Sequence, residues 1–467
     1  MKSLSWNSVF ERFAPFEGTS LYAIRTDAFF HLALESSSRR KFALKNLLYP
    51  ATIWRRSRKA QELAALPRGN VRYVFTCDYE AEPGFGTLRP LLRRFGNESL
   101  LIATDAVARE RAAEVQSFGA ELINLDAGAY AAARGRFAEL WERAGHELEQ
   151  LLASQQTAMR DTFLRSRRVL KTLLVKSYVY REVYRRCFTS LPGLSGVITH
   201  NDFTASSYLA CAAAREAGVT SFTLQHGFPT DEYFPISADH YLVWGERFRD
   251  VMAAKGARTG ALSITGAPRL DGLAAQRAQI DSQGDGGRVL FLSQSHSPLF
   301  THDEHTKILS FLAPVASDPW WKLSVRLHPQ EEEAGFRHLS GLGKTSIAPK
   351  DVPLMEALKN ADLVLACNST AMLEAMALGV PVVQIAPKEV QDRTGIVAAC
   401  RRAETPEQLR QVLISLVDPG SRRKLIAEQD QLLGSYLANF GSATDAAARL
   451  IRELTTVQST DAMEARA

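Results

Sequence analysis

The chain has 467 residues, of which 46% are hydrophobic, enough to form two or three separate cores. Its 56 Lys and Arg residues exceed its 51 Asp and Glu residues by only five, which argues against a dedicated nucleic-acid-binding protein. The five cysteines are widely spaced and form no CxxC pair, so the sequence predicts neither a zinc site nor a disulfide framework.

The apolar residues also bear on the cellular compartment. The N-terminus has no sustained apolar run of the signal-peptide type, and nowhere do about 18 uncharged apolar residues follow one another. We therefore expect a cytoplasmic protein that is neither exported nor membrane-spanning.

The first 65 residues contain a basic amphipathic segment at 39–59, in which eight Lys and Arg residues are interspersed with apolar ones. One interpretation is a solvated helical face. The other is docking on anionic lipid or on a lipid-linked acceptor, with the protein peripheral on the inner face of the plasma membrane.

From residue 71 onward, strand and helix patterns alternate. Strands are expected at 71–77, 99–104 and 121–125 with helices between them, and 82–86 forms a weak glycine-containing turn after the first strand. Residues 130–190 are expected to form long polar helices inserted in the first domain. Three more strands are expected at 196–202, 219–227 and 240–245.

A second alternating series follows a polar, glycine-containing stretch. We place the first domain at 1–270, a linker at 271–287, the second domain at 288–455 and a flexible tail at 456–467. Strands are expected in the second domain at 288–295, 322–329, 362–368 and 380–385. The predicted fold is α/β, with two Rossmann-like parallel-sheet domains facing a cleft and extra N-terminal helical segments.

In such folds ligands gather at the carboxyl ends of the strands. Five predicted strands end in hydrogen-bonding residues, which are Asp202, Gln225–Gly227, Ser293–Ser295, His328 and Asn368–Thr370. Because the strand ends of one sheet share an edge, these residues are the candidate site.

The strongest motif is ADLVLACNSTAMLEAMALGVPVVQI, at 361–385. Its strand delivers Asn368, Ser369 and Thr370 to the start of a helix, whose N–H groups and positive dipole end suit a phosphate. Glu374, one turn later, is placed to bind a ribose diol. The alternative is that Ser369 and Thr370 are helix caps and that Glu374 only stabilises the first turn.

This motif resembles the donor-nucleotide helix of GT-B glycosyltransferases, and nonhydrolysing UDP-sugar 2-epimerases share it. QHG at 225–227, GAPRLD at 266–271 and RLHP at 326–329 resemble the bacterial surface-polysaccharide branch. That branch includes capsule-type transferases that use CMP-linked Kdo or sialic acid, and CDP-glycerol polymerases. The resemblance covers residues 196–400.

The resemblance implies that His328 lies beside the leaving phosphate and that Arg326 makes a second contact. Metal-independent departure of a nucleotide requires such groups to neutralise its charge. The resemblance also makes His226 a candidate general base on the acceptor hydroxyl. Asp202 competes for that role, and His200 should point to the same side. Alternatively, Asp202 caps the following helix and His226 binds phosphate.

The remaining candidates are weaker. Ser293 and Ser295 suit a phosphate but equally suit a helix start. Arg269 is a hinge or phosphate contact, or it pairs with Asp271 or neighbouring acids. The histidines at 296, 302 and 305 lack the spacing of a metal site, and no metal is expected.

The expected function is a metal-independent, inverting glycosyltransferase that uses a CMP-, CDP- or UDP-linked donor and no separate cofactor. Its acceptor is a glycan or a lipid-linked glycan of a surface polysaccharide, and nucleic acid is not a partner. The alternatives are a 2-epimerase, a glycerophosphotransferase that uses CDP-glycerol, and a noncatalytic partner in polysaccharide assembly.

Overall fold

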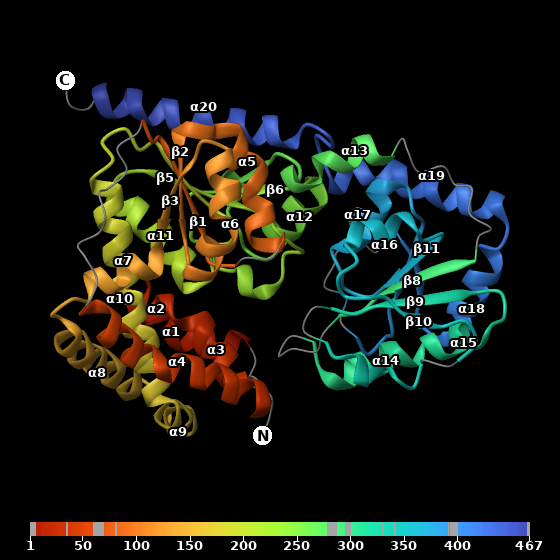
Figure 1. Ribbon diagram of the computed structural model, residues 1–467, viewed down its shortest axis with the longest axis horizontal. Coiled ribbons are helices and arrows are strands. Elements are labelled where there is room, and N and C mark those ends of the chain that lie inside the picture. The colour runs from red at the N-terminus through yellow and green to blue at the C-terminus, as the bar shows by residue number, and fades with distance from the viewer. Residues whose placement is uncertain are drawn as a thin grey trace.

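The computed structural model describes most of the chain and contains two parallel sheets (Figure 1). The described residues are 6–33, 36–58, 70–79, 82–277, 287–294, 300–328, 331–339, 342–390, 392 and 400–464. Ser295, His296 and the centre of the predicted linker lie outside them. In this part of the chain no helix has the length and apolar character needed to span a bilayer.

The first sheet has seven strands in the order β3-β2-β1-β4-β5-β6-β7, all parallel. Its central strands are apolar and buried on both faces, as expected when helices cover both sides of a parallel sheet. The strands are β1 (Tyr73–Cys77), β2 (Ser99–Ala103), β3 (Glu121–Asn124), β4 (Gly196–Thr199), β5 (Thr220–Leu224), β6 (His240–Val243) and β7 (Leu262–Ile264).

One face of this sheet is covered by the N-terminal helices and the predicted insertion, which share one apolar core. α10 runs through the centre of this core and buries an apolar stripe that includes Leu174 and Tyr184. The helices are α1 (Trp6–Phe13), α2 (Ser20–Ala23), α3 (Arg25–Ala33), α4 (Ser36–Ser57), α7 (Leu125–Ala132), α8 (Phe137–Ala153), α9 (Thr157–Arg165), α10 (Arg167–Thr189) and α11 (Ala205–Glu216).

The second sheet has six strands in the order β10-β9-β8-β11-β12-β13, again all parallel. These are β8 (Arg288–Leu292), β9 (Lys322–Arg326), β10 (Ser346–Ile347), β11 (Leu363–Ala366), β12 (Val382–Ile385) and β13 (Arg401–Ala403). Its helices are α14 (His302–Ser310), α15 (Leu312–Ser317), α16 (Leu354–Lys359), α17 (Ala371–Leu378), α18 (Pro406–Ser415) and α19 (Pro419–Tyr436). The predicted fold class, two parallel-sheet α/β domains with extra N-terminal helices, is confirmed.

The C-terminal helix returns to the first domain. α20 (Ala443–Glu464) starts inside the predicted second domain and continues into the predicted tail. Yet Ala447 and Ile451 pack on the first sheet beside α5 (Thr87–Phe95), in a core to which α6 (Asp105–Ser117) also contributes. Figure 1 shows this blue helix lying along the first domain. The chain therefore crosses between the domains twice.

The second crossing depends on two glycines. A Cβ atom on Gly245 would lie 2.5 Å from the Ser435 carbonyl oxygen, and one on Gly266 would lie 2.1 Å from the Ala438 carbonyl oxygen. Gly266 also has φ +90°, which favours glycine. Apolar residues of both domains, including Trp244 and Phe248 of the first and Met372 of the second, form one core beside this crossing. The two sheets are thus joined by a packed junction that includes α12 (Glu246–Ala254) and α13 (Asp271–Arg277).

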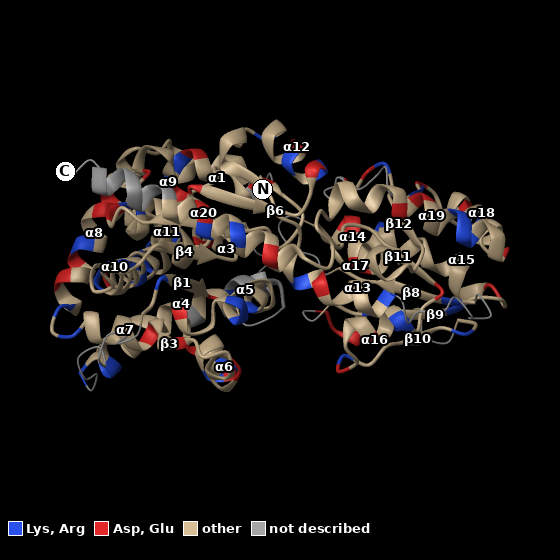
Figure 2. Ribbon diagram, turned by 90° about the horizontal axis from the view of Figure 1, so that it is seen from above, with Lys and Arg blue, Asp and Glu red and all other residues tan. Residues whose placement is uncertain are grey.

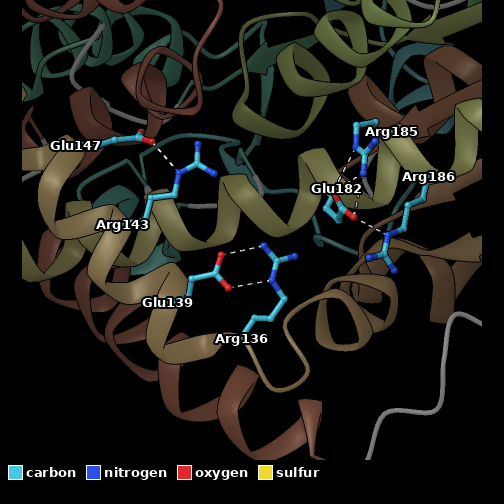
Figure 3. A network of polar contacts seen from close by, with 7 residues as sticks. All are labelled: Arg136, Glu139, Arg143, Glu147, Glu182, Arg185 and Arg186. Atoms are coloured by element: carbon cyan, nitrogen blue, oxygen red, sulfur yellow. Dashed lines mark hydrogen bonds and ion pairs between the residues drawn. The ribbon is translucent and has the colours of Figure 1, made fainter.

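Charges of both signs are interspersed over both domains (Figure 2). On the helical insertion they pair with one another, as Figure 3 shows: Arg136 with Glu139, Arg143 with Glu147, and Glu182 with both Arg185 and Arg186. The arginines of these pairs are exposed to solvent, so each pair contributes little stability. The basic run of α10 is therefore the solvated face that its sequence predicts.

Candidate functional site

The strand order of each sheet reverses once, and ligands of parallel α/β folds bind outside the carboxyl ends of the strands at that point. In the first sheet the reversal lies between β1 and β4, whose next polar side chains are Asp78 and His200. In the second sheet it lies between β8 and β11, which lead to Ser293 and to Asn368–Thr370. These two edges define the candidate site.

At the first edge, the buried His200 forms a pair with the partly exposed Asp78. Asp78 Oδ1 lies 3.2 Å from His200 Nε2, and Asp78 Oδ2 accepts a hydrogen bond from Thr204 Oγ1 at 2.7 Å. His200 Nε2 also lies 2.7 Å from Asn201 Nδ2, so the tautomer of the ring decides whether it donates to the carboxylate or accepts from the amide.

Burial raises the pKa of Asp78, but hydrogen bonds from His200 and Thr204 outweigh this effect and hold the pKa below its usual value. Asp78 is therefore an anion that can stabilise a protonated His200. Sequence analysis missed Asp78. The residue could have been selected because it directly follows the predicted strand at 71–77.

His226 follows β5, and its ring centroid lies 6.0 Å from that of His200. Its Nε2 atom is 3.0 Å from the Tyr233 hydroxyl, and the two rings stack. The pKa of His226 is lowered to about 3. The main cause is desolvation by burial among these neighbours, and the second is the nearby His200. His226 is therefore neutral near pH 7.

The turn that carries His226 is held by Gln225. The Gln225 side chain donates to the Gly227 carbonyl at 2.9 Å and accepts the Trp244 N–H at 2.8 Å. The Trp244 indole N–H also donates to the Gln225 carbonyl at 2.7 Å. These bonds are buried, so the direction of the turn is firmly set.

Asp202 is placed differently from the two histidines. Only 1% of it is exposed, and its Oδ2 accepts the N–H groups of Ser237 and Ala238 at 2.5 and 3.1 Å. Burial raises the pKa of Asp202 to about 6. The carboxylate thus holds the loop that precedes β6, and it does not cap α11, where the Thr204 N–H bonds to Asn201 instead.

At the second edge, the buried carboxylate of Glu331 connects three segments. It accepts the Ser293 hydroxyl at 2.9 Å and the His328 N–H at 2.7 Å, and it lies 2.9 Å from His305 Nε2 on α14. Burial raises its pKa, but these contacts hold the pKa below the usual value. Sequence analysis did not select Glu331. Its position three residues after the histidine of the HP motif was the only signal.

His328 and Arg326, both predicted to contact the leaving phosphate, lie beside this cluster. His328 is half-buried, and its pKa is lowered by burial, which Glu331 opposes and Lys350 reinforces. Arg326 Nη1 donates a hydrogen bond to the Val352 carbonyl at 2.6 Å, so part of its guanidinium is bonded to the backbone of a neighbouring loop.

The start of α17 lies at the domain junction. Ser369 Oγ accepts the Ala371 N–H at 3.3 Å, so Ser369 has the helix-capping role that the sequence left open as an alternative. Thr370 makes no side-chain cap bond. Asn368 is buried. A Cβ atom on Gly227 of the first domain would lie 3.8 Å from Thr370 Cγ2. The QHG turn and the start of α17 therefore meet across the junction.

An ion pair also crosses the junction. Arg269 Nη2 lies 2.9 Å from Glu374 Oε1, and both side chains are largely buried, with 12% and 7% exposed. Asp271 instead accepts the N–H groups of Ala443 and Thr444 at the start of α20, at 2.9 and 2.8 Å. Of the pairings open to Arg269, the structure selects Glu374, the residue predicted to bind ribose.

Among the residues that the structure describes, no three His, Cys, Asp or Glu side chains are grouped so as to hold a metal ion. His305 contacts Glu331 and belongs to the second-edge cluster.

Comparisons with known proteins give a family match for part of the sequence and a fold match for the structure. Residues 244–398 match the family described as "Putative glycosyltransferase (DUF6716)". No curated protein matches the sequence. The structure is similar to UDP-GlcNAc 2-epimerase from Neisseria meningitidis bound to UDP-GlcNAc, with a TM-score of 0.52 and 13% identity over 82% of this chain and 100% of that one.

It is also similar to Anabaena Alr3699/HepE in complex with UDP and glucose, with a TM-score of 0.52 and 11% identity over 82% of this chain and 99% of that one. The chain has the GT-B fold. At this identity the likeness shows the GT-B architecture alone, and the family match covers the segment from directly after β6 to beyond β12.

Proposed function

We propose that this GT-B protein is a metal-independent glycosyltransferase that moves a sugar from a nucleotide-activated donor to a growing surface polysaccharide or glycolipid. The observation that carries the proposal is the meeting of Thr370, at the start of α17, with Gly227 of the QHG turn. A helix N-terminus suited to phosphate and a histidine-bearing edge thus adjoin across two domains.

The donor nucleotide would lie at the second edge. Its phosphates would take hydrogen bonds from the start of α17 and from Ser369 and Thr370, with His328 neutralising the charge that develops on the leaving group. Glu374 would bind the ribose after exchanging its partner Arg269. Arg269 would then be free to contact a phosphate.

The acceptor would lie at the first edge, where the acceptor hydroxyl must lose a proton as its oxygen attacks the anomeric carbon. His200 suits this step because Asp78 Oδ1 lies 3.2 Å from its Nε2 and would stabilise the imidazolium that forms. The bond from the anomeric carbon to the phosphate oxygen breaks, and the nucleotide leaves with that electron pair. His226, with its low pKa, would serve as a neutral hydrogen-bonding partner.

A nucleotide panel tests the donor site. CMP, CDP, UDP, GDP and ADP are added to the wild type and to the Ser369→Ala/Thr370→Ala variant, with Ser346→Ala as an exposed control in the same domain. At a concentration of about 100 Kd, the favoured nucleotide should stabilise the wild type and the control by about 2.7 kcal/mol and the double variant by less. If no nucleotide shifts the melting of the folded wild type, the proposal fails.

A nucleotide-sugar 2-epimerase is the second candidate, because N. meningitidis UDP-GlcNAc 2-epimerase is among the structural neighbours. Incubation with UDP-GlcNAc and no acceptor separates the two functions. A C2-inverted sugar detected by NMR would establish epimerisation. A donor that stays unchanged without acceptor, and is consumed once a glycan acceptor is added, would support transfer.

A further inference from the structure

Helix α4 has two distinct faces. Its inner stripe, with side chains one helical turn apart, packs on the core of the first domain and includes Asn46, Tyr49, Ile53 and Ser57. The opposite stripe is exposed and follows the same spacing, with Arg40, Leu44, Leu48, Ala51, Arg55 and Arg58. We call this second stripe, together with the neighbouring Trp54, the α4 outer face.

The α4 outer face exposes large apolar side chains. Leu44 is 60% exposed, Leu48 56% and Trp54 48%, and among the described residues no large hydrophobic side chain is more exposed than Leu44. Single exposed hydrophobic residues are common on soluble proteins, but several on one helix face indicate an interaction surface.

The same face is cationic and has no acidic residues. Residues 36–61 contain eight Lys and Arg residues and no Asp or Glu. Arg40, Arg55 and Arg58 make no ion pair with any residue that the structure describes, and the Arg58 guanidinium lies 3.9 Å from the Trp54 ring centroid. Arg143 of α8 and Arg185 and Arg186 of α10 differ, because each forms an ion pair with a glutamate (Figure 3).

We propose that the α4 outer face docks the protein on an anionic lipid bilayer. Leu44, Leu48 and Trp54 would enter the headgroup boundary, while Arg40, Arg55 and Arg58 pair with lipid phosphates. Charge complementarity favours this occupant over a second copy of the chain, whose identical cationic face would repel the first. The inference does not depend on the proposed function, and it holds the first domain, the proposed acceptor side, against the membrane.

Sedimentation of the full-length protein with vesicles tests the inference. The vesicles are phosphatidylcholine with or without phosphatidylglycerol. We expect at least tenfold tighter binding to the anionic vesicles and loss of that binding at high salt. Arg40→Gln/Arg55→Gln/Arg58→Gln should weaken binding about a hundredfold, since each surface cation contributes about 1 kcal/mol.

A second variant tests the apolar part. Leu44→Ser/Leu48→Ser/Trp54→Ser should weaken binding at least tenfold, because the buried apolar area is lost. The matched controls, Ile414→Ser for the apolar set and Arg93→Gln/Arg410→Gln/Arg423→Gln for the cationic set, change exposed residues elsewhere and should bind as the wild type does.

Three results would overturn the inference: no preference of the wild type for anionic vesicles, equal losses in the control sets, or a dimer in light scattering that the α4 variants convert to monomer. The nucleotide-induced melting shift of the α4 variants is measured in parallel. It reports on the proposed function separately, because α4 lies outside the donor site.

Discussion

The carboxyl edges of the two sheets occupy equivalent positions in the fold but differ in how their polar groups are used. At the first edge, Asp78, His200 and His226 come from three strands, and His200 Nδ1 is buried without a hydrogen-bond partner. At the second edge, Glu331 ties Ser293 and His328 into one cluster. One edge thus retains a side-chain nitrogen that can accept a proton, whereas the other is a rigid frame.

The largest expected effect is at the first edge. His200→Gln and Asp78→Asn should each lower kcat about 10²- to 10⁴-fold, because the group that takes the acceptor proton or stabilises its charged form is lost. The nucleotide-induced melting shift should be unchanged, since Ser369, Thr370 and His328, the residues proposed to contact the phosphates, are retained.

The control for this prediction is His240→Gln, at the opposite end of β6, and His226→Ala is the competing assignment within the same edge. His240→Gln should retain full activity. If His226→Ala abolishes transfer while His200→Gln retains it, the catalytic base is His226 and the assignment within the first edge is reversed.

At the second edge the largest effect should be on stability. Glu331→Gln should lower the free energy of unfolding by about 2–4 kcal/mol, because a buried acceptor shared by Ser293, His305 and the His328 N–H is replaced by an amide that can satisfy only part of them. Urea unfolding measures this loss. The exposed neighbour Glu332→Gln should cost almost nothing, and equal costs for the two variants would contradict a rigid frame.

A substitution of Asp202 tests whether this buried carboxylate of the first domain affects stability and not catalysis. Its pKa is raised from 3.8 to about 6, so the folded state binds the proton more tightly and loses stability as the pH rises between these values. Asp202→Asn removes this loss. The variant should gain up to about 3 kcal/mol relative to the wild type between pH 4 and pH 7.

Melting curves across this pH range check the prediction. A stability difference between the variant and the wild type that does not change with pH would mean that the carboxylate has an ordinary pKa. A large loss of activity with unchanged stability would return Asp202 to the list of catalytic candidates.

The smallest expected effect concerns the pair that joins the two edges. A double-mutant cycle with Arg269→Gln and Glu374→Gln should give a coupling of about 1–2 kcal/mol in urea unfolding without ligand. If Glu374 turns to the ribose of a bound nucleotide, the coupling should fall when nucleotide is saturating. A coupling that nucleotide leaves unchanged would limit Glu374 to a structural role.

Most of the architecture was predictable from local patterns. The long buried strands, such as β1, β5 and β11, are apolar runs bounded by polar turns, and the predicted ranges contain them. The short edge strands β7, β10 and β13 were not predicted. Each has two or three residues, too few for a periodic signal, and exists because a neighbouring strand offers a free edge.

The site was predictable only in part. Strand ends identified His226, Ser293, His328 and Asn368–Thr370, because the chain places a polar residue directly after each apolar run. The strand end at Asp78 carries the same signal, whereas Glu331 lies in a loop whose contacts with β8 and α14 involve residues distant in sequence.

The sequence by itself determined the longer strands and the residues that end them, because these depend on periodicity and on turn residues a few positions apart. Only the tertiary structure decided that β1 lies beside β4, that α20 returns to the first sheet, and that Arg269 pairs with Glu374 instead of Asp271. These outcomes depend on how apolar faces pack and on which buried charges must be neutralised, and such constraints act between residues far apart in the chain.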